Sequence, residues 1–208
     1  MSAHVAVVLA AGGSRRLGHP KQLLTRDREA LVQRALRLAQ ATKPQRTLVV
    51  LGAHGRAIAD ALALQGVEVI DNPQWEAGLS TSVQAARDAL AASFTTSEVT
   101  PVLFLVCDQP ALDTAHLQAL LQAARGADNA CAATAYGARL GVPAVIAWKY
   151  LAQAALQGDA GLRGLLNGEQ ADAFARVEAP DLAFDLDTPE DVREAVARGW
   201  LDPGQIVG

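Results

Sequence analysis

The chain has 208 residues, half of them apolar and only 4% aromatic, and its formal net charge at neutral pH is −4. This length is enough to bury a sizeable core, and it fits a single domain over residues 1–208. An acidic balance without a basic patch argues against a nucleic-acid partner. Any anionic ligand must therefore be held by local positive charge.

Cysteine and histidine usage narrows the class of protein further. The two cysteines, Cys107 and Cys131, are too few for a disulfide framework or a thiolate metal cluster. The four histidines lack the close spacing that is typical of a zinc site. No apolar run approaches the ~18 residues of a membrane span, and no charged leader precedes Val5. We therefore expect a cytoplasmic protein without a membrane partner.

An apolar run over 5–9 predicts a buried first strand, and the stretch over 9–24, LAAGGSRRLGHPKQLL, predicts a phosphate-binding loop. Glycines let the backbone approach a ligand closely, while two arginines and Lys21 supply positive charge. Gly13 and Gly18 have the spacing of a Walker loop, but the lysine follows the second glycine by three residues instead of one. The dinucleotide fingerprint Gly-x-Gly-x-x-Gly does not occur here either.

Helical and extended patterns alternate along the rest of the chain. Apolar residues at helical spacing predict helices over 28–41, 56–64, 79–91, 114–125 and 148–156, with a helical turn over 164–166. Short β-rich runs predict strands over 47–51, 67–70, 99–106 and 174–177, a further strand near 130–135, and a loop over 137–146 that leads into a strand. The run over 99–106 is typical of a central parallel strand covered on both faces. The pattern predicts a three-layer α/β fold, with a mostly parallel sheet between helices.

Two segments carry polar residues next to these elements. In the segment over 71–82, Ser80 is a plausible N-cap and Gly78 permits a tight turn, so the helix start is available to an anion or a base edge. An ordinary cap after a proline turn explains the same residues. Asp108 follows the strand over 99–106, where open α/β sheets bind ligands, although a turn-forming carboxylate is the alternative. Cys107 is interpreted as a small buried hydrophobe.

The C-terminal region predicts a capped helix preceded by two carboxylates. Thr188 suits the N-cap position and Asp191 completes a capping box three residues later. Capping does not account for Asp185 and Asp187, which lie on the same face of an extended segment. Upstream, the run over 158–163, GDAGLR, can hold a polar substrate or form a local Asp–Arg pair in solvent.

The first loop matches a nucleotidyltransferase pattern, LAAGxSxRxGxxK, through Leu9, Ala10, Ala11, Gly12, Ser14, Arg16, Gly18 and Lys21. The sequence most closely resembles the molybdenum cofactor cytidylyltransferases, in the larger group of molybdopterin nucleotidyltransferases. The resemblance implies a Rossmann-like nucleotide-diphospho-sugar transferase fold. It also implies that CMP is transferred from CTP to molybdopterin, with release of pyrophosphate and a requirement for Mg²⁺. LAAG in place of LAGG points to CTP, and GTP is the alternative nucleotide.

The resemblance further implies roles for individual residues. Lys21, Arg16 and Asp108 are expected to act in catalysis, and Asp108 and Asp187 are expected to bind Mg²⁺, with Asp185 as a weaker second candidate. The expected nucleotide-binding residues are Leu9, Ala10, Ala11, Gly12, Gly13, Ser14, Arg16, Lys21, Asn72, Gly78, Ser80, Ser82 and Asp108.

Asp159 and Arg163, in the GDxGxR run that matches the family pattern, are expected to bind the acceptor. Other functions stay open at this point. One is cytidylyl or guanylyl transfer to a sugar or polyol phosphate. Another is a non-catalytic nucleotide-binding module that delivers the cofactor to a molybdoenzyme.

Overall fold

A computed structural model gives the fold of residues 3–61, 66–156, 162–168 and 171–205. Seven strands form one sheet, namely β1 (Val5–Leu9), β4 (Arg46–Leu51), β5 (Glu68–Asp71), β6 (Pro101–Val106), β7 (Ala132–Tyr136), β8 (Arg139–Ala147) and β9 (Ala175–Glu178). Their order is β5-β4-β1-β6-β8-β7-β9. β1 pairs in parallel with β4 and β6, whereas β8 runs antiparallel to β6 and β7. The sheet is mostly parallel, as the sequence predicts.

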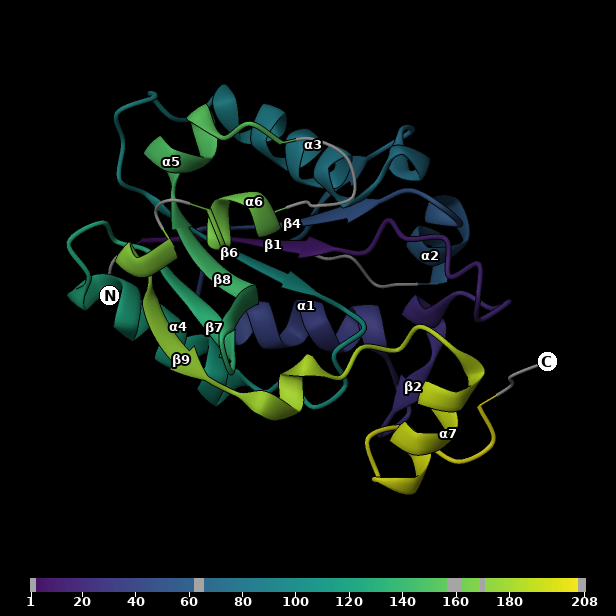
Figure 1. Cartoon of the computed structure of the whole chain (residues 1–208). Coiled ribbons are helices and arrows are strands. Elements are labelled where there is room, and N and C mark those ends of the chain that lie inside the picture. Colours follow the sequence, from purple (N-terminus) through teal and green to yellow (C-terminus); the bar gives the residue numbers. More distant parts are fainter. Residues whose placement is uncertain (1–2, 62–65, 157–161, 169–170, 206–208) are drawn as a thin grey trace.

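Helices cover both faces of the sheet (Figure 1). The helices of the described residues are α1 (Leu31–Ala41), α2 (Gly55–Ala61), α3 (Leu79–Ala91), α4 (Thr114–Gly126), α5 (Trp148–Gln153), α6 (Arg163–Leu166) and α7 (Pro189–Ala197), of which α7 lies away from the sheet (Figure 1). Side chains of β1 alternate between the two layers: Val5 and Val7 pack with α3 and α5, and Ala6 and Val8 pack with α1 and α4. The predicted three-layer α/β fold is therefore confirmed. None of the helices in the described part of the chain has the length and apolar character to cross a lipid bilayer.

The first predicted helix begins later than expected. It starts at Leu31, because β2 (Thr25–Arg26) and β3 (Glu29–Ala30) form a small antiparallel hairpin in front of it. Asp27 and Arg28 at the tip of the hairpin have φ angles of 55° and 64°. Asp27 suits such a left-handed angle, but Arg28 stands where glycine is usual, so the sequence signal of this turn is weak.

Three other expectations are corrected at element ends. Most of the segment over 137–146 belongs to β8, which forms a hairpin with β7 around Gly137, where φ is 65°. The helix predicted over 148–156 ends at Gln153. Ser80 is not an N-cap, because α3 starts at Leu79 and Gly78 occupies the cap position with φ 108° and no side-chain cap. The helix predicted over 56–64 corresponds to α2 (Gly55–Ala61), and 62–65 lie outside the described residues.

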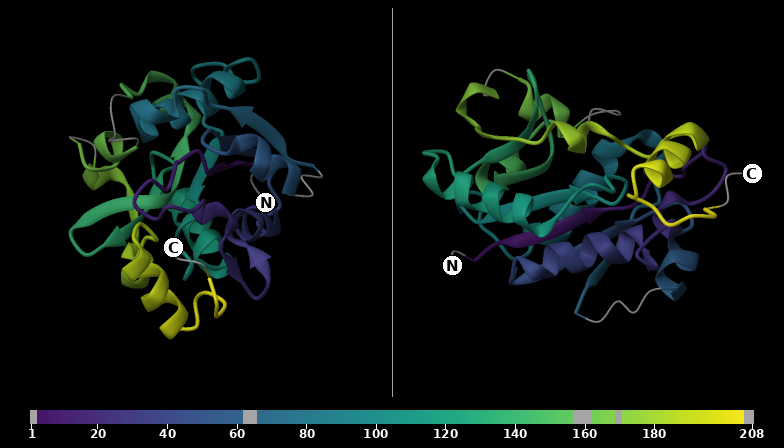
Figure 2. Two further views of the ribbon diagram at one scale, coloured as in Figure 1. Left: turned by 90° about the vertical axis from the view of Figure 1, so that its right-hand side faces the viewer. Right: turned by 90° about the horizontal axis from the view of Figure 1, so that it is seen from below.

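The C-terminal segment packs against the N-terminal part of the chain (Figure 2). The capping box of α7 is confirmed, since Thr188 and Asp191 each accept a hydrogen bond from the other's backbone N–H. A hydrophobic cluster joins the two segments, formed by Leu17, Leu24, Leu31, Leu186, Val192, Ala195 and Leu201. This packing carries residues near the C-terminus to the loop that follows β1.

Candidate active site

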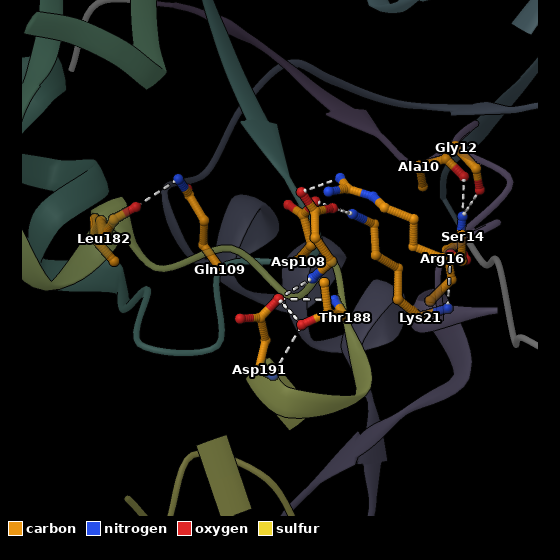
Figure 3. A network of polar contacts seen from close by, with 12 residues as sticks. Ala10, Gly12, Ser14, Arg16, Lys21, Asp108, Gln109, Leu182, Thr188 and Asp191 are labelled. Atoms are coloured by element: carbon orange, nitrogen blue, oxygen red, sulfur yellow. Dashed lines mark hydrogen bonds and ion pairs between the residues drawn. The ribbon is translucent and has the colours of Figure 1, made fainter. Parts of the chain in front are cut away.

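Polar residues from three distant parts of the chain meet at the carboxyl edge of the sheet (Figure 3). Because β1 and β6 are parallel neighbours, the loop after Leu9 and the residue Asp108 leave the sheet on the same side. The C-terminal segment joins them through a hydrogen bond of 3.1 Å, which the Leu186 N–H donates to the Asp108 carbonyl. This contact places Asp187 next to the first loop.

Lys21 lies between the two predicted metal-binding carboxylates. Its ammonium nitrogen is 2.5 Å from Oδ2 of Asp108 and 3.0 Å from Oδ1 of Asp187. The Arg16 guanidinium donates to the other oxygen of Asp187 at 2.8 Å. The Lys21 and Asp108 side chains are 14% and 17% exposed, whereas the side chain of Arg16 is 70% exposed. The structure thus brings together all four residues for which the sequence predicts catalytic or metal-binding roles.

These ion pairs shift the pKa values of the groups involved. Burial lowers the pKa of Lys21, but the Asp108 and Asp187 carboxylates outweigh burial, and the net pKa is raised above its usual value. For Asp187, desolvation raises the pKa, and the greater influence of Lys21 and Arg16 lowers it overall. Although Asp185 is an exposed residue, desolvation of its carboxylate and repulsion by Asp108 raise its pKa to about 7. All three groups can therefore respond to a bound cation or phosphate.

The first loop is held by its own polar side chains. Ser14 adopts a φ of 50°, and its hydroxyl accepts a hydrogen bond of 3.1 Å from the backbone N–H of Lys21. The buried amide of Gln22 donates to the carbonyls of Ala10 and Gly12, at 2.9 and 2.7 Å. The loop therefore folds back on the 3-10 helix η1 (Lys21–Leu23), and this fixes the base of the Lys21 side chain.

The two adjacent glycines of the loop have different environments. A Cβ atom on Gly13 would lie 2.6 Å from the Trp75 ring, whereas a Cβ on Gly12 would meet nothing within 4 Å. Trp75 belongs to the 3-10 helix η2 (Trp75–Ala77) and also packs against Gly52. Arg15 stacks over the Trp75 ring at 5.3 Å. Gly13 thus allows η2 to pack closely against the loop, while Gly12 leaves space for a ligand.

A pocket of about 580 Å³ opens beside Lys21 and Asp108. Its first wall comes from the end of β1 and the following loop, and its opposite wall comes from the β7–β8 hairpin and the 3-10 helix η5 (Pro180–Ala183). The predicted residues among its lining are Leu9, Ala10, Ala11, Gly12, Lys21, Asp108, Arg163 and Asp185. A volume of this size is typical of small-molecule sites, which span roughly 300–1,000 Å³.

Other predicted nucleotide-binding residues lie outside the pocket lining. Asn72 is buried and donates to the hydroxyls of Thr81 and Ser82, at 2.9 and 3.0 Å, so it ties the end of β5 to the start of α3. Ser80 is likewise buried. Contact of these residues with a nucleotide stays a prediction. Asp159, the predicted partner of Arg163 in acceptor binding, lies outside the described residues.

Two buried glutamines of the site, Gln22 and Gln109, are not among the residues predicted from the sequence. Gln22 follows Lys21 and supports the loop, and Gln109 follows Asp108 and contacts the opposite wall of the pocket. Their exposed fractions are 1% and 5%. A glutamine is seldom fully buried unless it is hydrogen-bonded, but this shows only once the fold is known. In the sequence, only their position directly after Lys21 and Asp108 indicates that they belong to the site.

The carboxylates also fit a divalent cation. Among the described residues, no three acidic, histidine or cysteine side chains are arranged so that they alone could hold a metal ion. Within the same part of the chain, Oδ1 of Asp108 is buried without a hydrogen-bond partner, and Oδ2 shares the Lys21 ammonium with Asp187. Mg²⁺ typically binds one or two carboxylates and completes its shell with phosphates and water. Asp108 and Asp187 together suit such a cation.

Several solved structures have a similar fold. Similar solved structures include an Rv0371c homologue from Mycobacterium sp. strain JC1, with a TM-score of 0.74, 28% identity, and coverage of 96% of this chain and 98% of that one. Rv0371c from Mycobacterium tuberculosis H37Rv has a TM-score of 0.73, 25% identity, and coverage of 94% and 99%, and it was also solved in complex with manganese. A nucleotidyl transferase from Methanothermobacter, Mth528, has a TM-score of 0.76, 22% identity, and coverage of 96% and 98%.

The fold is that of the α/β nucleotidyltransferases. Residues 6–174 match the model of the MobA-like NTP transferase domain. The chain belongs to the MobA-like NTP transferase family. A search of curated proteins found no match.

Proposed function

We propose that this nucleotidyltransferase transfers CMP from CTP to molybdopterin, releases pyrophosphate, and requires Mg²⁺. The observation that carries the proposal is the position of Lys21, whose ammonium lies between Asp108 and Asp187 beside an open glycine loop. A cation flanked by two carboxylates can be exchanged for a metal, which frees the lysine for a phosphate. CTP and molybdopterin themselves are proposed from the resemblance of the sequence to the cytidylyltransferases.

Each residue of the site has a proposed role in an in-line displacement at the α-phosphorus. The Gly12 backbone and Arg16 hold the β- and γ-phosphates, and Lys21 contacts the α-phosphate as negative charge builds there. Asp108 and Asp187 would hold Mg²⁺, which offsets charge on the phosphates when bound. Positioning and electrostatic stabilisation account for most of the catalysis in such transfers.

The acceptor needs no general base if its attacking group is a phosphomonoester. Its phosphate oxygen is already anionic, so it bonds to the α-phosphorus while the bond to the bridging oxygen of the β-phosphate breaks and pyrophosphate leaves with both electrons. We place the acceptor at the pocket wall formed by the β7–β8 hairpin and α6, where Arg139 and Arg163 both line the pocket. An arginine presents a fork of donors that suits a phosphate.

Ala11 is the residue that favours CTP in this proposal. It lines the pocket and is 4% exposed, so a change in its side chain alters the shape of the wall. Small apolar differences give only modest selectivity, about 10–200-fold. We therefore expect GTP to be used more slowly than CTP, and Ala11→Gly to narrow the difference.

Magnesium-dependent release of pyrophosphate tests the proposal. Wild-type protein is incubated with CTP or GTP, each combined with molybdopterin or with a sugar or polyol phosphate, and the nucleotide product is identified. We expect the fastest release with CTP and molybdopterin. Asp108→Ala should reduce the rate by at least about 100-fold, whereas Asp128→Ala, at an exposed position, serves as the matched control.

The other outcomes each point to a different function. Faster turnover with GTP would overturn the nucleotide assignment, and product formed only from a sugar or polyol phosphate would overturn the acceptor. Nucleotide binding without pyrophosphate release from any combination would favour a module that delivers the cofactor to a molybdoenzyme.

A further inference from the structure

The side chain of Gln109 contacts three elements of the pocket wall opposite the first loop. Its amide nitrogen lies 2.8 Å from the carbonyl oxygen of Leu182, 3.1 Å from that of Val142, and 3.0 Å from the Tyr136 hydroxyl. These partners belong to η5, β8 and β7. Figure 3 shows the amide reaching Leu182, away from Asp108 and Lys21. Through these contacts the amide nitrogen connects the end of β6 with the β7–β8 hairpin and with η5.

Several contacts join the end of β6 to the C-terminal segment. Besides its bond to the Leu182 carbonyl, the Gln109 side chain hydrogen-bonds Asp185, and the Leu186 N–H donates to the Asp108 carbonyl at 3.1 Å. Leu182 and Leu186 are both buried, at 4% and 0% exposed, so the hydrogen bonds made by their backbones lie next to buried apolar side chains. Asp187 follows Leu186 directly. The contacts of Asp108 and Gln109 therefore help to set the position of Asp187, together with its ion pairs to Lys21 and Arg16.

We infer that Gln109 is a positioning residue for the metal: through Leu182 its amide holds the C-terminal segment so that Asp187 reaches the cation held by Asp108. The inference rests on the proposed function in taking these two carboxylates as the metal ligands. Loss of the amide donors leaves the buried Leu182 carbonyl without this partner, and the segment relaxes to recover one. Changes to groups that orient metal ligands typically weaken metal binding by about 10–100-fold.

Manganese binding tests this directly, because the electron paramagnetic resonance signal of free Mn²⁺ gives a dissociation constant without any turnover. Two variants remove the contact: Gln109→Met keeps the length of the side chain without its donors, and Gln109→Asn keeps an amide that is one methylene shorter. We expect each to raise the Mn²⁺ dissociation constant by about tenfold. Gln118→Met, at an exposed position on α4, is the matched control. A dissociation constant within about twofold of wild type in either folded variant would overturn the inference.

A second measurement separates positioning from a general loss of stability. If Gln109 acts through Asp187, Gln109→Met has no further effect on Mn²⁺ affinity in an Asp187→Ala background. An undiminished loss in that background would show that Gln109 acts by another route. At saturating Mg²⁺ the kcat of Gln109→Met should also recover toward wild type, because the defect lies in metal occupancy.

Thermal unfolding in EDTA completes the test. If both variants fail to fold, Gln109 maintains the fold rather than the site, and the inference is wrong. Failure of the wild-type protein to transfer a nucleotide to any acceptor would remove the proposed function, but it would leave the Mn²⁺ result intact. The two failures are therefore distinguishable.

Discussion

Lys21 makes opposite contributions to metal binding and to catalysis. In the structure its ammonium occupies the space between Asp108 and Asp187, at 2.5 and 3.0 Å. A divalent cation must compete with this charge, whereas a phosphate needs it. The same residue therefore opposes metal binding in the free protein and assists transfer once substrates are bound.

Lys21→Met should separate these two effects. We expect kcat to fall by at least about 100-fold, because charge on the α-phosphate loses its partner. We expect Mn²⁺ to bind more tightly in the absence of nucleotide, because the competing ammonium is gone. Steady-state kinetics and Mn²⁺ titration measure the two quantities, and Lys43→Met, at an exposed position, is the control. Weaker Mn²⁺ binding in folded Lys21→Met protein would contradict this account.

Gly12 and Gly13 should respond differently to the same substitution. In Gly13→Ala the new methyl group lies 2.6 Å from the Trp75 ring, so we expect a loss of about 1–3 kcal/mol in the free energy of unfolding. In Gly12→Ala the methyl group meets no atom of the protein within 4 Å and φ lies outside the left-handed region, so stability should be kept.

Gly12→Ala should weaken nucleotide binding although it leaves stability unchanged. Its new methyl group projects where the backbone would approach a phosphate, and we expect CTP affinity to fall in a protein with wild-type Tm. Thermal denaturation and isothermal titration of both variants provide the comparison. Unchanged CTP affinity in Gly12→Ala would show that the phosphates do not approach the loop there.

At the scale of elements, Asp202 attaches the C-terminal segment to the β2–β3 hairpin. Its carboxylate accepts hydrogen bonds from the Thr25 hydroxyl at 2.6 Å and from the backbone N–H groups of Asp27 and Arg28, both at 2.8 Å. The hydroxyl contact and these backbone bonds lower the pKa of Asp202. The stabilisation is therefore present above the ordinary aspartate pKa, about 3.9, and is lost as the pH falls through the lowered value.

Asp202→Asn should be less stable than wild type at pH 7, because the amide cannot accept these donors as a charged carboxylate does. The difference should shrink at an acidic pH below the lowered pKa of Asp202, where the wild-type carboxylate is protonated as well. Urea unfolding at the two pH values measures it, with Asp172→Asn, in the 3-10 helix η4 (Ala171–Ala173), as the control. An equal difference at both pH values would exclude the carboxylate charge as the cause.

The sequence predicts the elements whose signals are local. The apolar run of β1, the glycine loop and the position of Asp108 after β6 all follow from composition and order along the chain. The β2–β3 hairpin escapes prediction because its strands are only two residues long and Arg28 adopts a left-handed angle where glycine is usual. Gln109 is likewise missed, since its partner Leu182 is distant in sequence and offers a backbone carbonyl, which no residue type reveals.

For the whole molecule, the site is assembled from the two ends of the chain and from its middle. Lys21 follows the first strand, Asp108 the central one, and Asp187 precedes the last helix. The family match covers residues 6–174, so Asp187, which the resemblance predicts as a metal ligand, lies beyond it. The structure brings Asp187 into contact with Lys21 and Arg16. A ligand that contacts all three residues should therefore stabilise the first loop and the C-terminal segment together.

Hydrogen exchange with and without Mg²⁺ and CTP should show this coupling. A ligand that binds only the folded state at a hundred times its dissociation constant stabilises it by about 2.7 kcal/mol, so Tm should rise. We expect new protection both over 10–24 and over 184–188, because the metal replaces Lys21 as the link between Asp108 and Asp187. In Asp187→Ala the second region should stay unprotected while the first keeps part of its protection through the phosphates. Protection confined to 10–24 in the wild-type protein would mean that the C-terminal carboxylate takes no part in binding, and that Asp108 holds the metal without it.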